Sequence, residues 1–283
     1  MIENVFLNGK IVPADEAKIS PLDYGILYGL GIFETMRSYN GKVFLLEKHL
    51  KRLSQNASAL GISLEIDLKT AVNSLLESNG LSDARIRITV SGGPGKSLPD
   101  SPDFPNPTVL ITANTYQPFA DEIYAKGFKA IISTIRRNSQ SPVPQLKTTN
   151  YLENLMAKWE AKKKGADEVV FLNEHDQVAE AGSANIFIVS EGVLMTPPVA
   201  AGILPGVTRE AVLKLAAGLE IEIREQDIWL DNLLEADESF LTNSMYEVMP
   251  LVHVAKYRIG AGKPGTVTKR LMQSYKDLVD SSK

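Results

Sequence analysis

The sequence has no cysteine, only three histidines and no long apolar run. Without cysteine it can form no disulfide and no thiolate metal site, and it offers no thiol nucleophile. His49, His175 and His253 are too widely spaced for a local ligand pair such as HxxxH, so we expect no metal. The apolar runs fall short of the roughly 18 residues that a membrane span needs, and the start, MIENVFLNGK, is unlike a signal peptide. We therefore expect a cytoplasmic protein.

An excess of charge of one sign is also missing. The chain has 30 Lys and Arg against 34 Asp and Glu, which gives a net charge of −4. This balance excludes the basic footprint of a protein that binds nucleic acid or an acidic membrane. With 283 residues, 44% of them hydrophobic and 23% charged, the composition is typical of a soluble globular protein with about two domains.

Hydrophobic periodicity predicts alternating helices and strands. From Leu46 to Leu60, apolar residues recur at intervals of three and four and stop at Gly61, which is the pattern of an amphipathic helix. From Arg85 to Ser91, polar and apolar residues alternate, which predicts a half-buried strand. Similar patterns predict helices at 67–79, 150–164, 207–217 and 266–279, and strands at 4–7, 108–113, 128–135, 168–172, 184–189 and 193–195. We therefore predict a mixed α/β fold with mixed sheets.

The middle of the chain suggests a division into two domains. Six prolines from Pro94 to Pro118 exclude a continuous helix there. We place a smaller α/β domain at 1–116, a linker at 117–126 and a larger domain at 127–283. The segment GGPGKS at 92–97 ends like a phosphate-binding P-loop, but it lacks the earlier glycine and the following helix, so we exclude that function.

Three other segments carry residues whose role stays open when each segment is taken alone. Lys147 precedes the predicted helix at 150–164; it is either a solvated loop lysine, the favoured interpretation, or an amine whose pKa the positive helix end lowers. Glu180 is either a turn residue, again favoured, or a partly buried ion-pair partner. The segment GILPGVTR, with Thr208 at a predicted helix start, is either a plain N-cap or a phosphate seat.

Six segments taken together resemble one family. They are YGLGIFETMRSY, HLKRL, LKTTNYL, AEAGSANIF, GILPGVTRE and LTNSMYEVMPL, and the resemblance runs from VFLNGK at the start to about residue 275. The chain resembles the fold-type IV (class IV) pyridoxal-phosphate enzymes, which include branched-chain aminotransferases, D-amino acid aminotransferases and 4-amino-4-deoxychorismate lyases. The resemblance implies pyridoxal 5'-phosphate in the cleft between two domains, small amino acid and 2-oxo acid substrates, and a homodimer whose partner subunit helps to close the site.

The resemblance also implies roles for individual residues. Lys147 would form the internal aldimine and move the proton at the substrate Cα, and Glu180 would keep the pyridine nitrogen protonated. The other cofactor-binding residues would be Arg52, Val207, Thr208 and Ser244 at the phosphate, and Tyr151 near the phenolic oxygen. The substrate-binding residues would be Tyr28, Phe33, Arg87, Asn243 and Met245.

The chain departs in places from each subgroup of the family. Family members usually have Gly after the glutamate, where this chain has Ala181, and we expect the single methyl group to be tolerated. The Arg-x-His pair typical of D-amino acid aminotransferases is replaced by Gly92 and Pro94, so among aminotransferases we place that type after the branched-chain type. Phe33 and Met245 suggest an apolar wall suited to an aliphatic side chain. We therefore predict a branched-chain aminotransferase.

Two alternatives to transamination remain. Asn243, in a Thr-Asn-Ser turn, and the segment Arg136-Arg137-Asn138 look more like a deoxychorismate lyase, which eliminates pyruvate to give 4-aminobenzoate in the folate pathway. The lyase is therefore the main alternative. A non-catalytic binding protein on the same fold is disfavoured because Lys147, Glu180 and Arg52 occur together.

Overall fold

The computed structural model describes residues 3–282, which form two compact units. The N-terminal unit comprises residues up to Gln117 together with the segment Leu146–Asn150 and Ser282. The C-terminal unit comprises Pro118–Gln145 and Tyr151–Ser281. The chain thus returns once, at residues 146–150, to the unit that it began with. Among residues 3–282, no helix has the length and apolar character that crossing a bilayer requires.

The N-terminal unit is built on a six-stranded sheet with the order β2-β1-β6-β5-β3-β4. Adjacent strands in it run antiparallel. Its elements are β1 (Asn4–Leu7), β2 (Lys10–Pro13), α1 (Tyr24–Tyr28), β3 (Gly31–Tyr39), β4 (Lys42–Val43), α2 (Leu46–Ala59), α3 (Leu68–Ser78), β5 (Ala84–Ser91) and β6 (Thr108–Thr115).

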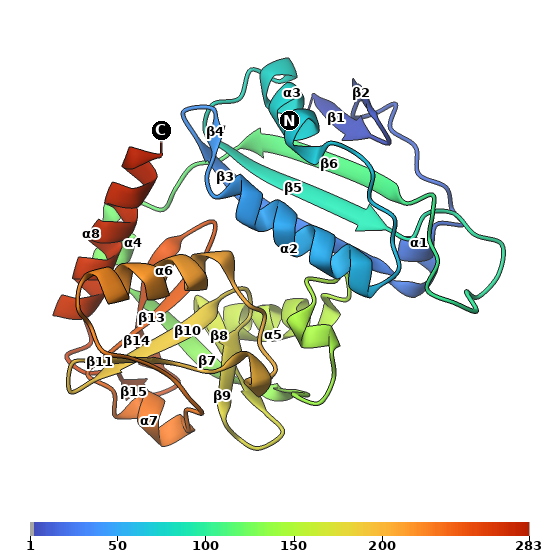
Figure 1. Ribbon diagram of the computed structural model, residues 1–283. Helices are drawn as coiled ribbons and strands as arrows, with labels where there is room; N and C mark the ends of the chain where they lie inside the picture. The colour runs from blue at the N-terminus through green and yellow to red at the C-terminus, as the bar shows by residue number, and fades with distance from the viewer. Residues whose placement is uncertain (1–2, 283) are drawn as a thin grey trace. The chain divides into compact units, whose positions relative to one another are not determined.

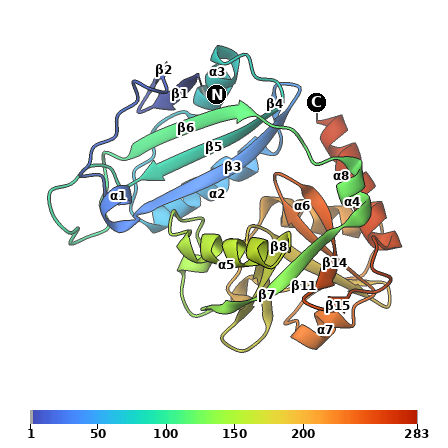
Figure 2. The ribbon, with the colours of Figure 1, turned by 180° about the vertical axis from the view of Figure 1, so that it is seen from behind.

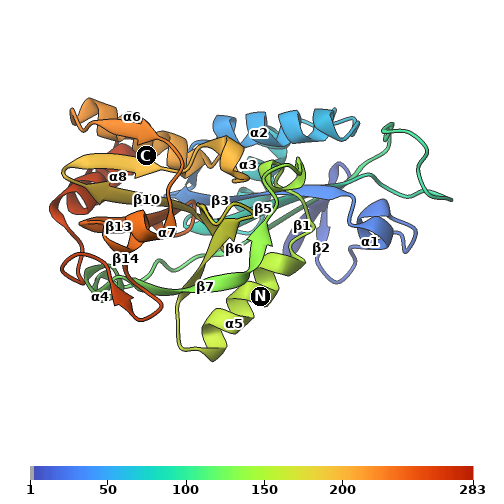
Figure 3. The same cartoon turned by 90° about the horizontal axis from the view of Figure 1, so that it is seen from below.

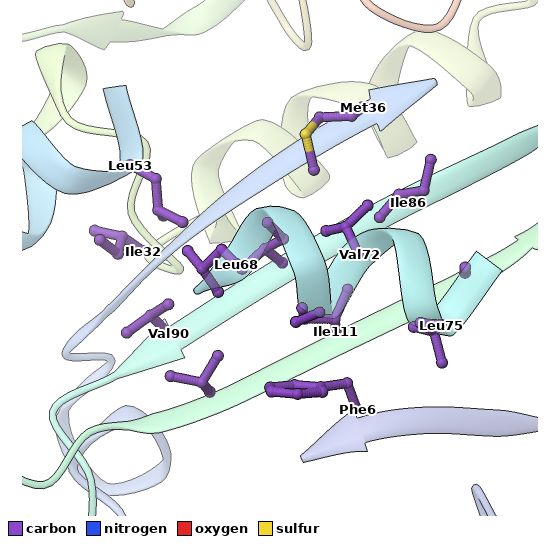
Figure 4. Close-up of a cluster of buried hydrophobic side chains, with 14 of the residues drawn as sticks. Phe6, Ile32, Met36, Leu53, Leu68, Val72, Leu75, Ile86, Val90 and Ile111 are labelled. Atoms are coloured by element: carbon purple, nitrogen blue, oxygen red, sulfur yellow. The ribbon is translucent and has the colours of Figure 1, made fainter. Parts of the chain in front are cut away.

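Two helices cover one face of this sheet, as α2 does in Figures 1 and 3. Alternation along β3 and β5 directs Ile32, Met36, Ile86 and their even-numbered neighbours toward α2 and α3. Figure 4 shows these side chains meeting Leu68, Val72 and Leu75 of α3, together with Phe6, Leu53, Val90 and Ile111. The opposite face carries the odd-numbered, more polar residues, and Figure 2 views the unit from that side. One strand therefore supplies the core and a chemically different surface at once.

The C-terminal unit is built on a nine-stranded mixed sheet with the order β12-β11-β10-β13-β14-β7-β8-β9, and β15 pairs with β14. Its strands are β7 (Phe128–Arg137), β8 (Glu168–Asn173), β9 (Val178–Ala181), β10 (Asn185–Ser190), β11 (Val193–Thr196), β12 (Ile223–Glu225), β13 (Glu238–Asn243), β14 (Glu247–Val254) and β15 (Tyr257–Arg258). Its helices are α4 (Asp121–Lys126), α5 (Leu152–Lys163), α6 (Val207–Gly218), α7 (Leu230–Leu234) and α8 (Thr266–Ser281). Short 3₁₀ turns lie at Val143–Gln145 and Val199–Ala201.

The core of the C-terminal unit lies on one face of its sheet. Val170 of β8, Ile186 of β10, Leu241 of β13 and Met249 of β14 are buried in a single cluster. The other face of β7 and β8 is covered by α5, whose Ala157 packs with Val169, Phe171 and Ile131. Strands buried on both faces read as continuous apolar runs, which is why β8 and β10 stand out in the sequence.

All predicted helices and strands are present, with ends shifted by a few residues. The prediction missed β2, β3, β4, β9, β12, β15, the three short helices and the β13–β14 hairpin. The short helix α4 (Asp121–Lys126) forms the second part of the segment 117–126 that we expected to be a linker. The β13–β14 hairpin was not predicted because both of its strands are largely buried. The segment Glu238–Val254 therefore shows neither the alternation of a half-buried strand nor a helical period.

The packing of α3 against the core of the N-terminal unit can be tested directly. Leu75 is fully buried in this core, so Leu75→Ala should lower the free energy of unfolding by about 2–5 kcal/mol, because the cavity left behind cannot close. Leu98→Ala, at an exposed leucine, should change it by less than about 0.5 kcal/mol. Urea titration followed by circular dichroism measures both. Equal effects of the two variants would contradict the packing.

Candidate active site

Lys147 is held against the beginning of β3 by backbone pairing. The Phe33 N–H donates to the Lys147 carbonyl at 2.8 Å, and the Thr149 N–H donates to the Gly31 carbonyl at 2.8 Å. The Thr149 hydroxyl also donates to the Gly29 carbonyl at 3.0 Å. The segment therefore acts as a short extra strand at the edge of the N-terminal sheet, and the position of Lys147 is set by β3.

The aromatic ring of Phe33 lies beneath two cations. The Lys147 Nζ atom lies 4.5 Å from the ring centroid, and the Arg87 Cζ atom lies 3.8 Å from it. The helix that follows Lys147, α5, begins at Leu152, two residues later than predicted. A helix dipole acts mainly within its first turn. The surroundings of Lys147 are instead supplied by the aromatic ring and by neighbouring charged groups.

A buried ion-pair network lies on the other face of β3. Glu34 is completely buried and receives two hydrogen bonds from Arg52, from Nε and from Nη2, each of 2.7 Å. The Nδ1 atom of His49 lies 2.7 Å from Glu34 Oε2. His49 and Arg52 are three residues apart on α2 and so share the helix face that packs on the sheet. The guanidinium of Arg52 is thus fixed in plane by a carboxylate.

The network sets the protonation states of its members. Burial would raise the pKa of Glu34, but the charge of Arg52 and the hydrogen bonds from His49 and Arg52 outweigh burial and bring it to about 2. Burial lowers the pKa of His49, and the positive charges of Arg52 and Lys147 lower it further, against the opposing effect of Glu34. Glu34 is therefore ionised and His49 neutral at neutral pH. An ionised carboxylate only accepts hydrogen bonds, so His49 carries its proton on Nδ1.

Sequence reasoning did not single out Glu34 and His49. A signal was present, because Glu34 falls between Ile32 and Met36 at an inward-facing position of the strand. A lone charge in such a position requires a buried partner.

In the C-terminal unit, the predicted site residue Glu180 is also a buried carboxylate. It lies in β9, so the turn favoured from its segment alone is wrong and the ion-pair alternative is confirmed. Arg137 Nε lies 3.2 Å from Glu180 Oε1, and the Leu204 N–H donates to Oε2 at 3.1 Å. The guanidinium of Arg137 also stacks on Phe171, with 4.0 Å between Cζ and the ring centroid. Arg137 was noted in the sequence but not predicted as a site residue.

The turn that follows Glu180 is held by the start of α5. The Tyr151 hydroxyl donates to the Gly182 carbonyl at 3.0 Å, and the Asn154 amide donates to the same carbonyl at 2.8 Å. The Lys158 ammonium donates to the Ser183 hydroxyl at 3.0 Å. Tyr151, predicted to lie near a cofactor oxygen, is thus placed beside the residues that follow Glu180.

The predicted phosphate segment leads into α6. Val207 and Thr208 are its first two helical residues and both are buried. The N-cap is Gly206, so Thr208 is not an N-cap, and no side chain caps the helix. Backbone N–H groups at such a helix start are suited to bind an anion.

The predicted Asn243–Met245 turn is built by Asn243 itself. Its Oδ1 accepts the N–H groups of Met245 at 2.8 Å and of Tyr246 at 2.9 Å, and its Nδ2 donates to the Ser183 carbonyl at 3.0 Å. Asn243 thereby ties this turn, which carries Ser244, to the turn that follows Glu180.

Besides Phe33, two predicted substrate-binding residues belong to the N-terminal unit. Tyr28 ends α1 and is half exposed, and its ring lies 6.0 Å from that of Tyr24. Arg87 is fixed on the polar face of β5, where its Nε donates to the Thr89 hydroxyl at 3.1 Å and its guanidinium covers Phe33.

The low pKa of Glu34 predicts a loss of stability in acid. Its carboxylate should stabilise the fold by about 3 kcal/mol above pH 4.5, and this contribution should disappear as the pH falls from 4.5 toward 2. The lowered pKa of His49 acts in the same direction below pH 6.5, because only the unfolded chain takes up that proton readily. Urea unfolding at a series of pH values measures how the free energy of unfolding changes with pH.

Glu34→Gln should flatten this slope and lower stability at pH 7, because Arg52 keeps a buried charge without its carboxylate partner. Glu47→Gln is the matched control, since Glu47 is an exposed carboxylate on α2. The ionised state of Glu34 is refuted if Glu34→Gln and the unmodified chain lose stability equally between pH 4.5 and 2.

Known proteins similar to this chain show the family to which it belongs. A family model described as amino-transferase class IV matches residues 31–254. A Methanocaldococcus jannaschii protein, provisionally named a branched-chain-amino-acid aminotransferase, is 37% identical over 278 residues, or 97% of this chain and 96% of that protein. The aminodeoxychorismate lyase of Bacillus subtilis is 32% identical over 277 residues, or 96% and 93% of the two chains.

A solved structure extends the similarity to the fold. The T.th. branched-chain amino acid aminotransferase with pyridoxamine 5'-phosphate matches with a TM-score of 0.93 at 30% identity, over 100% of this chain and 96% of that chain. Other structures of the T.th. enzyme contain N-(5'-phosphopyridoxyl)-L-glutamate or 4-methylvaleric acid. These matches confirm the predicted mixed α/β fold. The chain therefore belongs to the class IV aminotransferases, a family of pyridoxal-phosphate-dependent enzymes.

Proposed function

We propose that this chain is an aminotransferase that uses pyridoxal 5'-phosphate to move an amino group between a branched-chain amino acid and a 2-oxo acid. The observation that carries this proposal is Lys147, an amine fixed by backbone hydrogen bonds to β3, in a chain that belongs to the class IV aminotransferases. A lysine held in this way is suited to attach a carbonyl cofactor.

The donor set fits the chemistry of the cofactor. A dianionic phosphate needs cationic and N–H donors: the N-terminal unit offers Arg52, and the C-terminal unit offers the start of α6, with Val207 and Thr208, and the Ser244 hydroxyl. A pyridinium nitrogen needs a carboxylate, and the buried Glu180 meets Arg137 and the Leu204 N–H. A carboxylate accepts up to about four hydrogen bonds, so a further donor is compatible with both.

The chain's own residues divide the work of proton transfer. When bound, the cofactor supplies an electron sink for the charge that develops at the substrate Cα. The amine of Lys147 would take the proton from that carbon and pass it on to the cofactor, which transamination requires. Glu180 holds the proton on the pyridine nitrogen, and Tyr151 contributes a hydroxyl near the phenolic oxygen.

Substrate selection rests on an apolar wall and a carboxylate clamp. We assign the wall to Phe33 and Met245 and the clamp to Arg87 with Tyr28. The guanidinium of Arg87 is held by Thr89 and by the Phe33 ring, so it is preorganised for a bidentate carboxylate contact. The aliphatic preference is supported by the 4-methylvaleric acid complex of the T.th. enzyme.

The deoxychorismate lyase is the second candidate, and the 32% identity to the Bacillus subtilis lyase supports it. The main sequence argument for it was the polar side chain of Asn243. That side chain is engaged at both ends, in its own turn and with Ser183. These hydrogen bonds give Asn243 a structural role, so its polar side chain no longer argues for the lyase, and we favour the aminotransferase.

We also propose a homodimer. The outer face of α5 exposes Leu152, Leu155, Met156 and Trp159, which follow the spacing i, i+3, i+4 and i+7. Separately, α1 exposes Ile26, Leu27 and Tyr28. Exposed apolar patches of this kind are typical of protein contact surfaces.

The assignment of Lys147 predicts covalent attachment. Borohydride treatment should fix the cofactor to the unmodified chain but not to Lys147→Ala, and peptide mass spectrometry should locate the product at residue 147. Turnover of Lys147→Ala should fall by about 10²–10⁴ or more, because the base at Cα is lost. The matched control is Lys69→Ala, at an exposed lysine of the same unit. Stoichiometric fixation in Lys147→Ala would show that another lysine is responsible.

The choice between transamination and elimination can be tested with single turnovers. Loaded enzyme mixed with leucine or valine, without any 2-oxo acid, should release one equivalent of the matching 2-oxo acid per bound cofactor. A panel of L- and D-amino acids sets the stereospecificity, and Lys147→Ala gives the baseline. The lyase is supported instead if no amino acid reacts while aminodeoxychorismate releases pyruvate.

A further inference from the structure

The backbone of Leu204 is hydrogen-bonded on both sides by side chains of two strands, Glu180 of β9 and Asn185 at the start of β10. Its N–H donates to Glu180 Oε2 at 3.1 Å, and its carbonyl accepts a hydrogen bond from Asn185 Nδ2 at 2.8 Å. Both polar groups of one residue are thereby satisfied by two side chains five positions apart. Glu180 and Leu204 are joined directly, and Asn185 completes the link.

Asn185 is itself held firmly. It is buried, it begins β10, and it lies opposite Thr242 of β13 in the sheet. A Cβ atom on Gly206 would overlap the Oδ1 atom of Asn185. The amide group is therefore wedged between the Leu204 carbonyl and the Gly206 Cα, and only glycine permits this approach.

The position of Leu204 determines where α6 begins. Only Pro205 and Gly206 separate Leu204 from the first helical residue, Val207, and the ring of Pro205 fixes its own φ. A short, stiff connection of this kind transmits a displacement of Leu204 to the helix start. Val207 and Thr208 have no side-chain cap that could hold them independently.

From this geometry we propose that Asn185 is a positioning residue for the phosphate end of the cofactor. The inference rests on the proposed function, in which Glu180 meets the pyridine nitrogen and the start of α6 meets the phosphate. The cofactor is a rigid ring, so these two contacts need a fixed spacing. The Leu204 peptide supplies this spacing, with Glu180 at one end and Asn185 at the other. Asn185 thus acts on phosphate binding through the backbone without touching the ligand.

The experiment compares two ligands that differ only in the phosphate. Pyridoxal phosphate and pyridoxal are titrated against apoprotein of the unmodified chain and of Asn185→Ala. We expect Asn185→Ala to bind pyridoxal phosphate about tenfold more weakly, because the Leu204 carbonyl loses its donor and the helix start shifts. The affinity for pyridoxal should change by less than about twofold, because pyridoxal has no phosphate to bind at the start of α6.

Two further variants separate positioning from a loss of stability. Ser239→Ala removes another buried side-chain hydrogen bond, from the Ser239 hydroxyl to the Phe187 carbonyl at 3.0 Å, and should leave the ratio of the two affinities unchanged. Asn185→Asp keeps the size of the side chain but replaces the donor with an oxygen, and should lower the ratio as Asn185→Ala does. It serves as the test variant if Asn185→Ala does not fold.

The outcomes distinguish this inference from the function on which it rests. If the unmodified chain prefers pyridoxal phosphate and both Asn185 variants keep that preference, Asn185 does not position the phosphate seat. If the unmodified chain binds the two ligands equally, the phosphate seat at α6 is itself wrong, and the role of Asn185 falls with it. A preference lost in both variants and kept in Ser239→Ala supports the proposal.

Discussion

The pairing of Lys147 and Thr149 with the start of β3 is the contact on which the chemistry of the N-terminal unit depends. Three consecutive residues of that strand have three different tasks because side chains alternate along it. Ile32 enters the core, Phe33 lies beneath the Lys147 and Arg87 cations, and Glu34 holds Arg52 and His49. A shift of β3 by one residue against β5 would turn Phe33 toward the core and Glu34 away from Arg52 and His49, so register and chemistry are set together.

Two of the buried carboxylates, Glu34 and Glu180, are paired with arginine, but in different ways. Glu34 receives two 2.7 Å bonds from one guanidinium in a bidentate arrangement, and its charge serves the structure. Glu180 meets Arg137 Nε at 3.2 Å through one oxygen and accepts a backbone N–H with the other. Two charges gain most from a well-aligned bidentate pair, so Arg52 holds Glu34 more firmly than Arg137 holds Glu180.

The sequence predicted the elements well where a period was strong, as in α2, α3 and β5. It also predicted correctly that Arg85, Arg87 and Thr89 lie on the polar side of their strand. It misjudged Glu180 because a strand of four residues beside small residues resembles a turn until its partner strands are known. It placed Lys147 near a helix because distance along the chain cannot reveal that residues 146–150 pair with β3. The sequence did not predict the network of Glu34, His49 and Arg52 for the same reason, because this network joins a strand to a helix that follows later in the chain.

The departure at Ala181 shows how the structure limits what a family pattern demands. Family members usually have glycine directly after the glutamate, yet Ala181 is buried in the core of the C-terminal unit and its methyl group is accommodated there. The position that requires glycine is the next one. A Cβ on Gly182 would meet Glu168 Oε1 at 2.6 Å and the Cγ of Lys158 at 3.0 Å, while the Gly182 carbonyl accepts hydrogen bonds from Tyr151 and Asn154. The close approach of Glu168 and Val169 of β8, and of Lys158 of α5, therefore favours glycine at 182, whereas position 181 accommodates a methyl group. The prediction that this methyl group is tolerated has its physical reason in that one-residue offset.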